Sequence, residues 1–182
     1  MMRKPLVLTK EQIDGEDPAN EAWQVTLDHI EGLEGKERTE YIRCLPQLWR
    51  AVYTGFRLQN EVNNGGYHQF FWNSVGALNR ETLDDLRLIS AGPFVLLFEE
   101  AMDEYQQHDY RGEKTESGNS WEAFTKAYKE KRMADLDEAF CKIPKTIAMH
   151  LSDYILKNRS MYSQSAKFPG KGRPLGRASN KK

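Results

Sequence analysis

Apolar residues recur at helical spacing along most of the chain. Within residues 18–33 they occupy every third or fourth position: Trp23, Leu27, Ile30 and Leu33. Asp17 directly before Pro18 is typical of a helix start, because aspartate caps the first free N–H groups and proline suits the first helical position. The spacing therefore predicts a helix over about 18–33, ended by Gly32 and Gly35.

The middle of the chain predicts a long buried helix with a break. A second helix is expected from about Glu37, and Pro46 should kink or restart it because proline lacks the N–H that a helix interior needs. The positions that follow suit a largely buried helix: Leu48, Trp49, Val52, Phe56 and Val62. Gly65–Gly66 should break this helix, and Tyr67–Phe71 should continue it as a short aromatic segment that ends at Gly76.

Further helices are expected over residues 82–89, from Phe94, from Ser120, around 136–143 and around 147–155, with a polar loop over 111–119. Only residues 5–9 suggest a short extended segment. The predicted fold class is all-α, a single compact multi-helix domain over residues 1–158. Residues 159–182 are rich in Gly, Ser, Pro and basic residues without a core-forming pattern, so they are predicted to form a basic, flexible tail.

Composition places the chain among ordinary globular proteins, since 39% of residues are hydrophobic and 29% are charged. No apolar run approaches the ~18–20 residues that a membrane span needs, so no membrane association is expected. The first residues lack the apolar core of a secretory signal. Cys44 and Cys141 are far apart in the sequence and form neither a metal-binding pair nor a disulfide framework. Together these features predict a cytoplasmic protein.

The charge is divided unevenly along the chain. Residues 1–156 hold 18 basic and 27 acidic side chains, a net charge of −9, whereas residues 157–182 hold eight basic and no acidic ones. Two stretches are the most acidic, residues 11–40 at −8 and 81–109 at −7. They supply a candidate acidic interaction surface: Glu31, Glu34, Asp84, Asp85, Glu99, Glu100, Asp103 and Glu104. The plainer alternative is a set of solvated helix faces. The basic tail has the opposite charge and could fold back over such a surface.

Sequence signatures of catalysis are missing. The chain has no phosphate-binding loop, nucleophile elbow or paired metal-ligand motif, and its four histidines lie at no ligand spacing. Neither a cofactor nor a metal is predicted, and enzymatic activity is the less favoured interpretation.

One segment, Glu61 to Gly76, concentrates amides, glycines and aromatics. Its candidate residues are Glu61, Asn63, Asn64, Gly65, Gly66, His68, Gln69 and Asn73. They form either a polar pocket for a ligand or a hydrogen-bonded corner between two helices, and we favour the corner. Gln69 and Asn73 are four residues apart, so their amides are expected to meet each other and to bond the free backbone groups at the break.

The same segment carries a resemblance to a known family. The string Gln59–Phe71, followed by Asn73-Ser74 and Gly76, resembles the signature of the DNA-mimic protein 19 family, a bacterial domain of unknown function. Leu48–Tyr53 and Ala91–Pro93 are compatible with it, and the resemblance is specific over about residues 45–110. It implies an all-helical domain. The family's named member is an acidic dimer that imitates DNA and sequesters a transcription factor, but most members have no known activity.

Three functional hypotheses follow. The first is a non-catalytic protein-binding domain that binds a basic, DNA-binding protein through an acidic surface, with a homodimer as the state that the resemblance implies. The second is a small enzyme or ligand-binding protein that uses the Glu61–Asn73 segment. The third is a nucleic-acid binder acting through the basic tail, since direct nucleic-acid binding is not expected elsewhere. The first is preferred.

Overall fold

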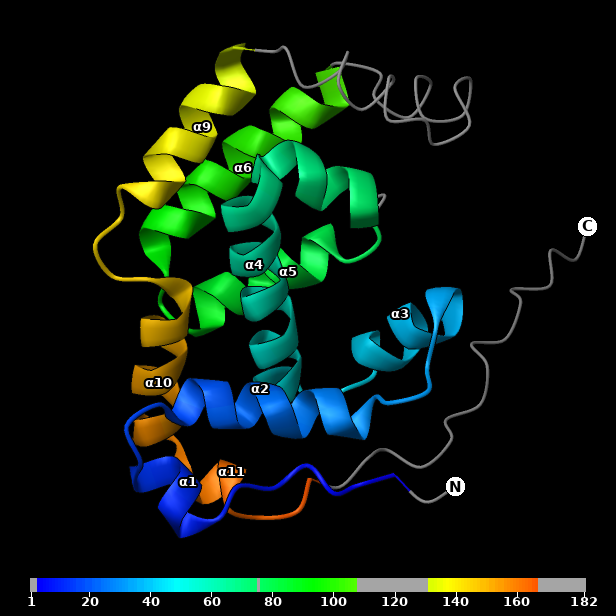
Figure 1. Cartoon of the computed structure of the whole chain (residues 1–182), viewed down its shortest axis with the longest axis vertical. Coiled ribbons are helices and arrows are strands. Elements are labelled where there is room, and N and C mark those ends of the chain that lie inside the picture. The colour runs from blue at the N-terminus through cyan, green and yellow to red at the C-terminus, as the bar shows by residue number, and fades with distance from the viewer. Residues whose placement is uncertain (1–2, 75, 108–130, 167–182) are drawn as a thin grey trace, which may run out of the picture.

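A computed structural model describes residues 3–74, 76–107 and 131–166 (Figure 1). These residues form helices and connecting loops without a strand, so the all-α prediction is confirmed. The helices are α1 (Lys10–Asp14), α2 (Pro18–His29), α3 (Gly35–Arg43), α4 (Gln47–Ser74), α5 (Asn79–Leu88), α6 (Gly92–Gln107), α9 (Lys131–Cys141), α10 (Ile147–Lys157) and α11 (Arg159–Tyr162). The expected polar loop and the helix from Ser120 lie outside the described residues.

Local sequence signals set several of the helix starts. Asp17 caps α2 by accepting a hydrogen bond from the N–H of Asn20, and Pro18 occupies the first turn, as predicted. Thr9 and Gln12 form a reciprocal capping box at α1. Thr146 caps α10 through the N–H of Met149. Each cap satisfies an N–H group that would otherwise lack a partner.

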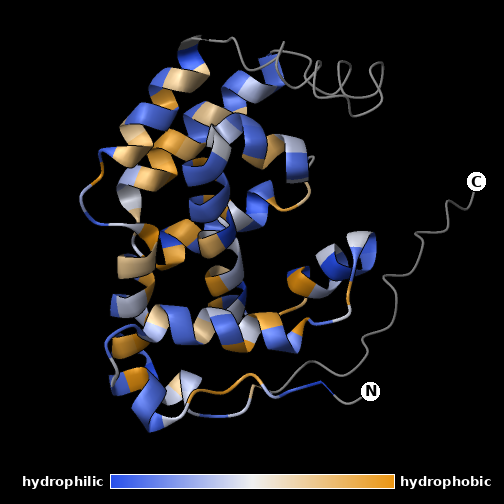
Figure 2. Ribbon diagram, viewed as in Figure 1, coloured by the Kyte–Doolittle hydropathy of each residue, from blue (hydrophilic) through white to orange (hydrophobic). Residues whose placement is uncertain are grey.

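The long helix α4 lies at the centre of the fold. It packs against α2, α5, α9 and α10, and α6 and α9 pack against each other beside its second half (Figure 1). Gly55 allows a close crossing with α10, because a Cβ atom there would lie 3.0 Å from the Cγ2 atom of Ile147. Figure 2 shows hydrophobic and hydrophilic positions alternating along the helices, as expected for helices with one buried face.

Aromatic side chains dominate the core beside the second half of α4. Tyr67, Phe70 and Phe71 are almost completely buried. Phe71 stacks on Tyr105 of α6 with ring centroids 4.5 Å apart, and Tyr67 meets Phe140 of α9 edge to face at 5.7 Å. Such pairs contribute about 0.5–1.5 kcal/mol beyond the burial of their surface.

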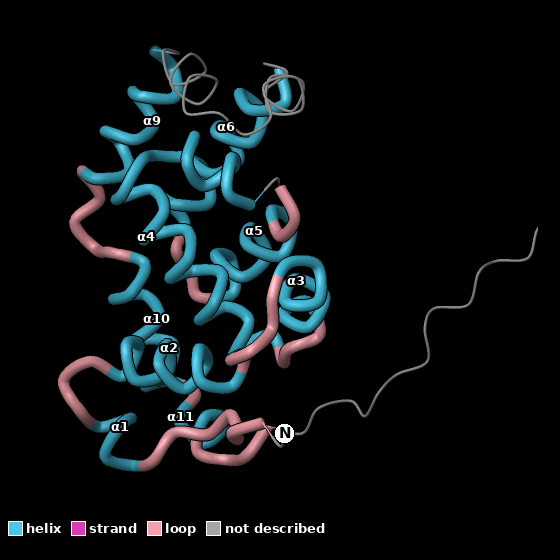
Figure 3. The backbone as a smooth tube through the Cα atoms, turned by 45° about the vertical axis from the view of Figure 1, so that its right-hand side comes forward, coloured by secondary structure: helices cyan, strands magenta, loops and turns pink. Residues whose placement is uncertain are grey.

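The folded part of the chain extends beyond residue 158. Tyr162 of α11 is completely buried, packs edge to face on Trp49 and donates a hydrogen bond to the carbonyl of Leu48 at 3.0 Å. Two backbone hydrogen bonds join this segment to the extended residues 5–9, from Leu8 N–H to the Tyr162 carbonyl and from Ala166 N–H to the Leu6 carbonyl (Figure 3). The predicted boundary at residue 159 is therefore too early, since residues 159–166 pack against the body.

None of the helices in the described ranges combines the length and apolarity needed to cross a membrane.

Candidate functional site

The glycine pair divides α4 into two helical segments, as predicted. Gly65 and Gly66 have non-helical backbone angles, and Gly66 has φ +73° and ψ −180°, a region that is essentially limited to glycine. The second segment therefore starts at Tyr67, whose N–H lacks a partner within its own helix. Asp137 of α9 accepts a hydrogen bond from this N–H at 2.7 Å. A carboxylate 70 residues away in the sequence thus caps the second segment.

Both glycines leave room for a side chain that lies against them. A Cβ atom on Gly66 would lie 2.1 Å from Oδ2 of Asp137, and one on Gly65 would lie 2.2 Å from Oε1 of Gln69. Burial raises the pKa of Asp137 to about 6, although its hydrogen bond from Tyr67 acts in the opposite direction. The Gly-Gly sequence therefore lets the backbone turn and also lets the Asp137 carboxyl approach it.

Glu61 organises the polar side of the corner. Its Oε2 atom accepts hydrogen bonds from Nε2 of Gln69 and from Nδ2 of Asn73, each at 2.8 Å. The expectation that the two amides bond each other and the backbone at the break is wrong, because both are used by this carboxylate. Glu61 precedes the break and the amides follow it, so the two bonds connect the segments of α4.

The remaining residues of the predicted pocket are dispersed. His68 is 2% exposed and its ring lies 5.9 Å from that of Trp72, so it belongs to the buried side of α4. Asn63 is exposed. Gly66 is buried beneath Asp137. Glu61, Asn64 and Gln69 remain together on the surface of a cavity.

Two cavities meet at a pair of arginines that the sequence analysis did not select. The inner cavity, of about 400 Å³, lies between α3, the two segments of α4 and the start of α5. The outer cavity, of about 540 Å³, lies between α2, α3 and α4. Arg38 and Arg57 line both. Asn73 lines the inner cavity, whereas Glu61, Asn64 and Gln69 line the outer one.

Asp85 does not belong to an acidic surface, contrary to the prediction. It is 1% exposed and accepts two hydrogen bonds from Arg50, at 2.8 and 2.9 Å, and one from Thr54 at 3.0 Å. Burial raises the pKa of Asp85 against these opposing bonds, and the hydrogen bonds that Arg50 donates to Asp85 raise the pKa of Arg50. The pair joins α4 to α5.

The other predicted acidic residues fall into two separate groups. Glu31 and Glu34 are exposed in the α2–α3 connection, while Asp84, Glu99, Glu100, Asp103 and Glu104 lie on α5 and α6. Arg87 pairs with Asp84 and Glu99, and Arg132 pairs with Glu100. The α5–α6 group is thus partly neutralised by neighbouring arginines.

The described residues contain no group of three or more His, Cys, Asp and Glu side chains placed to hold a metal ion. His29, one of the scattered histidines, is buried and lies 2.9 Å from the Tyr41 hydroxyl. Burial lowers the pKa of His29.

Comparison with known proteins found no match among curated proteins and none among solved structures. A family model described as DMP19-like protein matches residues 43–158, which include all of α4, the Gly65–Gly66 corner and Asp137. The matched region covers more than half of the chain and contains the residues that carried the resemblance in the sequence. The chain belongs to the DMP19-like protein family.

Proposed function

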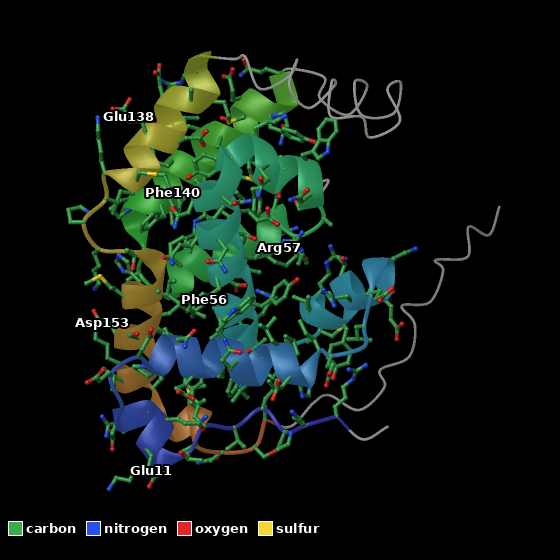
Figure 4. All side chains as sticks on the ribbon, in the orientation of Figure 1. Glu11, Phe56, Arg57, Glu138, Phe140 and Asp153 are labelled. Atoms are coloured by element: carbon green, nitrogen blue, oxygen red, sulfur yellow. The ribbon has the colours of Figure 1, made fainter. Side chains whose placement is uncertain are left out.

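We propose that this protein binds a basic partner protein through an acidic N-terminal surface. This surface consists of the exposed carboxylates of α1, α2, α3 and their connections: Glu11, Asp14, Glu16, Asp17, Asp28, Glu31, Glu34, Glu37 and Glu40. In Figure 1 these helices lie in the lower part of the molecule, together with α10 and α11, and Figure 4 labels Glu11 at its edge. Complementary charge accelerates encounter with a basic partner and disfavours acidic ones.

The observation that carries the proposal is the small number of ion pairs on this surface. Asp14 pairs with Arg159, Asp28 with Lys4 and Glu40 with Lys36. The other six carboxylates form no ion pair with any described residue. Exposed pairs of this kind contribute only about 0–1 kcal/mol, so a partner's arginines and lysines displace them at little cost.

Family membership supports protein binding in general terms, because the named member of the DNA-mimic protein 19 family imitates DNA. The matched residues begin at 43, after the acidic N-terminal surface. The surface is therefore an addition to the matched region, and its partner need not be the same as that of other members.

A charge-neutralising variant tests the proposal. Glu16, Glu31 and Glu34 lie outside the helices and form no ion pair with a described residue, so changing all three to Gln should leave the fold intact. The matched control changes Asp103, Asp135 and Glu138, on α6 and α9, to the corresponding amides, with the same change in net charge.

Each protein is immobilised and used to capture partners from a native lysate, with identification by mass spectrometry. We expect a basic DNA-binding protein that wild type and control retain and that the Glu16/Glu31/Glu34 variant loses. Equal retention by both variants, or loss only in the α6–α9 control, would contradict the proposal.

A further inference from the structure

Arg57 occupies an unusual position for a cation. Its Nε atom is buried without a hydrogen-bond partner, and among the described residues its guanidinium donates one side-chain hydrogen bond, from Nη1 to the Tyr53 hydroxyl at 3.3 Å. Glu61 lies four residues further along the same helix, a spacing at which helical ion pairs form. No ion pair forms, because Gln69 and Asn73 engage the Glu61 carboxylate instead. A half-buried guanidinium with a buried, unbonded Nε–H and no counter-ion is unfavourable, so an anion should be attracted to it.

The inner cavity provides a second cation and neutral polar side chains. Arg38 enters it from α3 and uses Nε to bond the Leu33 carbonyl at 2.6 Å, which leaves its terminal nitrogens facing no carboxylate within ion-pair distance among the described residues. The described lining includes no carboxylate, but it does include hydroxyl and amide side chains: Thr39, Thr54, Asn73, Ser74 and Thr82. Thr39 and Thr54 already donate to other groups, and Asn73 donates to Glu61, so the hydroxyls of Ser74 and Thr82 are the neutral donors offered to an anion. Arginine with such donors is the usual protein environment of carboxylates and phosphates.

The start of α5 adds to the positive potential. Ala77 and Leu78 line the inner cavity directly before α5, and no side chain caps this helix. The N-terminal end of a helix carries a partial positive charge and free N–H groups, so it favours a nearby anion. The positive end of α5 therefore adds to the positive charge of Arg38 and Arg57.

The outer cavity has a different lining. Trp23, Leu27 and Tyr53 contribute aromatic and aliphatic surface next to Arg57, and Asn60, Asn64 and Gln69 contribute amides. Glu61 contributes a carboxylate, which already accepts hydrogen bonds from Gln69 and Asn73. Both cavities, at about 400 and 540 Å³, fall in the size range of small-molecule sites. An anionic group in the inner cavity would place an attached apolar group against Trp23 and Tyr53.

We infer that the two cavities form one binding site for a small organic anion, in which Arg57 and Arg38 bind a carboxylate or phosphate group and the outer cavity holds an aromatic or aliphatic body. This site is separate from the acidic N-terminal surface. Binding an anion explains the position of Arg57, whose guanidinium forms no ion pair with any described residue.

Four probes separate the two anionic groups and test the apolar half: inorganic phosphate, phenyl phosphate, acetate and phenylacetate. Binding to the full-length protein is measured by calorimetry at constant ionic strength, with chloride as the balancing anion. We expect phenyl phosphate or phenylacetate to bind with a Kd on the order of 1 mM or lower, an affinity that ligands of this size can reach. This phenyl compound should bind more tightly than inorganic phosphate or acetate, respectively.

Variants locate the binding. Arg57→Gln should weaken the affinity roughly tenfold or more, because it removes charged hydrogen bonds, and Arg38→Gln should weaken it in the same direction. The matched control is Arg87→Gln on the exposed side of α5, which should bind like wild type. The NMR signal of the Arg57 Nε–H group should also shift on titration, which tests the site without any substitution.

The inference is overturned if none of the four anions binds at an anion concentration of roughly 10 mM, which is about tenfold above the expected Kd. It is equally overturned if the Arg57 Nε–H signal stays unchanged at saturation, or if Arg87→Gln loses as much affinity as Arg57→Gln. If circular dichroism shows that Arg57→Gln is unfolded, Arg38→Gln and the NMR titration decide the question.

Discussion

Replacing Gly66 by Ala should be among the most damaging single-methyl changes in this chain. Holding a non-glycine residue at φ +73° and ψ −180° costs about 1–3 kcal/mol. The new Cβ would also lie 2.1 Å from the Asp137 carboxylate, so this group must move away from the N–H of Tyr67. Loss of a hydrogen bond to a charged group costs about 1.5–3 kcal/mol. The two effects together predict a loss of about 3–5 kcal/mol, a large part of a typical domain's stability.

Urea denaturation followed by circular dichroism measures this loss. The matched control is Gly92→Ala at the start of α6, where a Cβ would meet nothing within 4 Å and φ is not positive. The control should change the free energy of unfolding by less than about 1 kcal/mol.

A double-mutant cycle with Asp137→Ala separates the two causes, because without the carboxylate Gly66→Ala should cost only its backbone strain. A loss below 1 kcal/mol for Gly66→Ala, or one equal to that of Gly92→Ala, would refute the reasoning. Equal costs of Gly66→Ala with and without the Asp137 carboxylate would refute the role of the close contact.

Three further predictions concern stability. Because burial raises the pKa of Asp137 to about 6, its contribution favours the folded state below about pH 4 and is lost as the pH rises through about 6. The stability of wild type relative to Asp137→Asn should therefore fall by about 1–2 kcal/mol from pH 4 to 7. Urea denaturation of both proteins across this pH range measures the difference, and a difference that does not change with pH would contradict the prediction. Asp85→Ala should cost about 3–5 kcal/mol in urea denaturation, since it leaves the Arg50 guanidinium without its carboxylate, and a loss under 1 kcal/mol would mean that water replaces the pair. Deleting residues 160–182 should cost about 3 kcal/mol more than deleting 167–182, because only the longer deletion removes buried Tyr162, and equal melting curves would contradict this.

Structural features that depend on residues close together in the sequence could be predicted. Asp17 with Pro18 marks the start of α2, and the Gly65–Gly66 pair marks the break in α4, because these signals act within one helical turn. The partner of that break could not be found in this way. Asp137 lies 70 residues from Tyr67 and is one of many acidic residues on predicted helices. Only the packing of α9 against α4 identifies it.

Counting charges failed where burial decides their role. The position of Asp85 in an acidic stretch suggests that it lies on the surface. However, it follows Thr82 by three residues and precedes Ile89 by four. This spacing puts it on the buried face of α5 with both of them, and it was the available sequence signal. Arg57 gave no such signal. Its spacing from Glu61 suggests an ordinary ion pair, and only the amides of Gln69 and Asn73 explain why none forms.

Competition with DNA tests the central claim most directly. A basic DNA-binding partner captured as described above is bound to a fluorescent duplex, and release of the duplex is followed by anisotropy as this protein is added at two salt concentrations. The account predicts release by wild type and by the α6–α9 control, at least about tenfold weaker release by the Glu16/Glu31/Glu34 variant, and weaker release at high salt because exposed charges are screened. Absence of release, or release that neither the variant nor salt alters, would contradict binding through the acidic N-terminal surface.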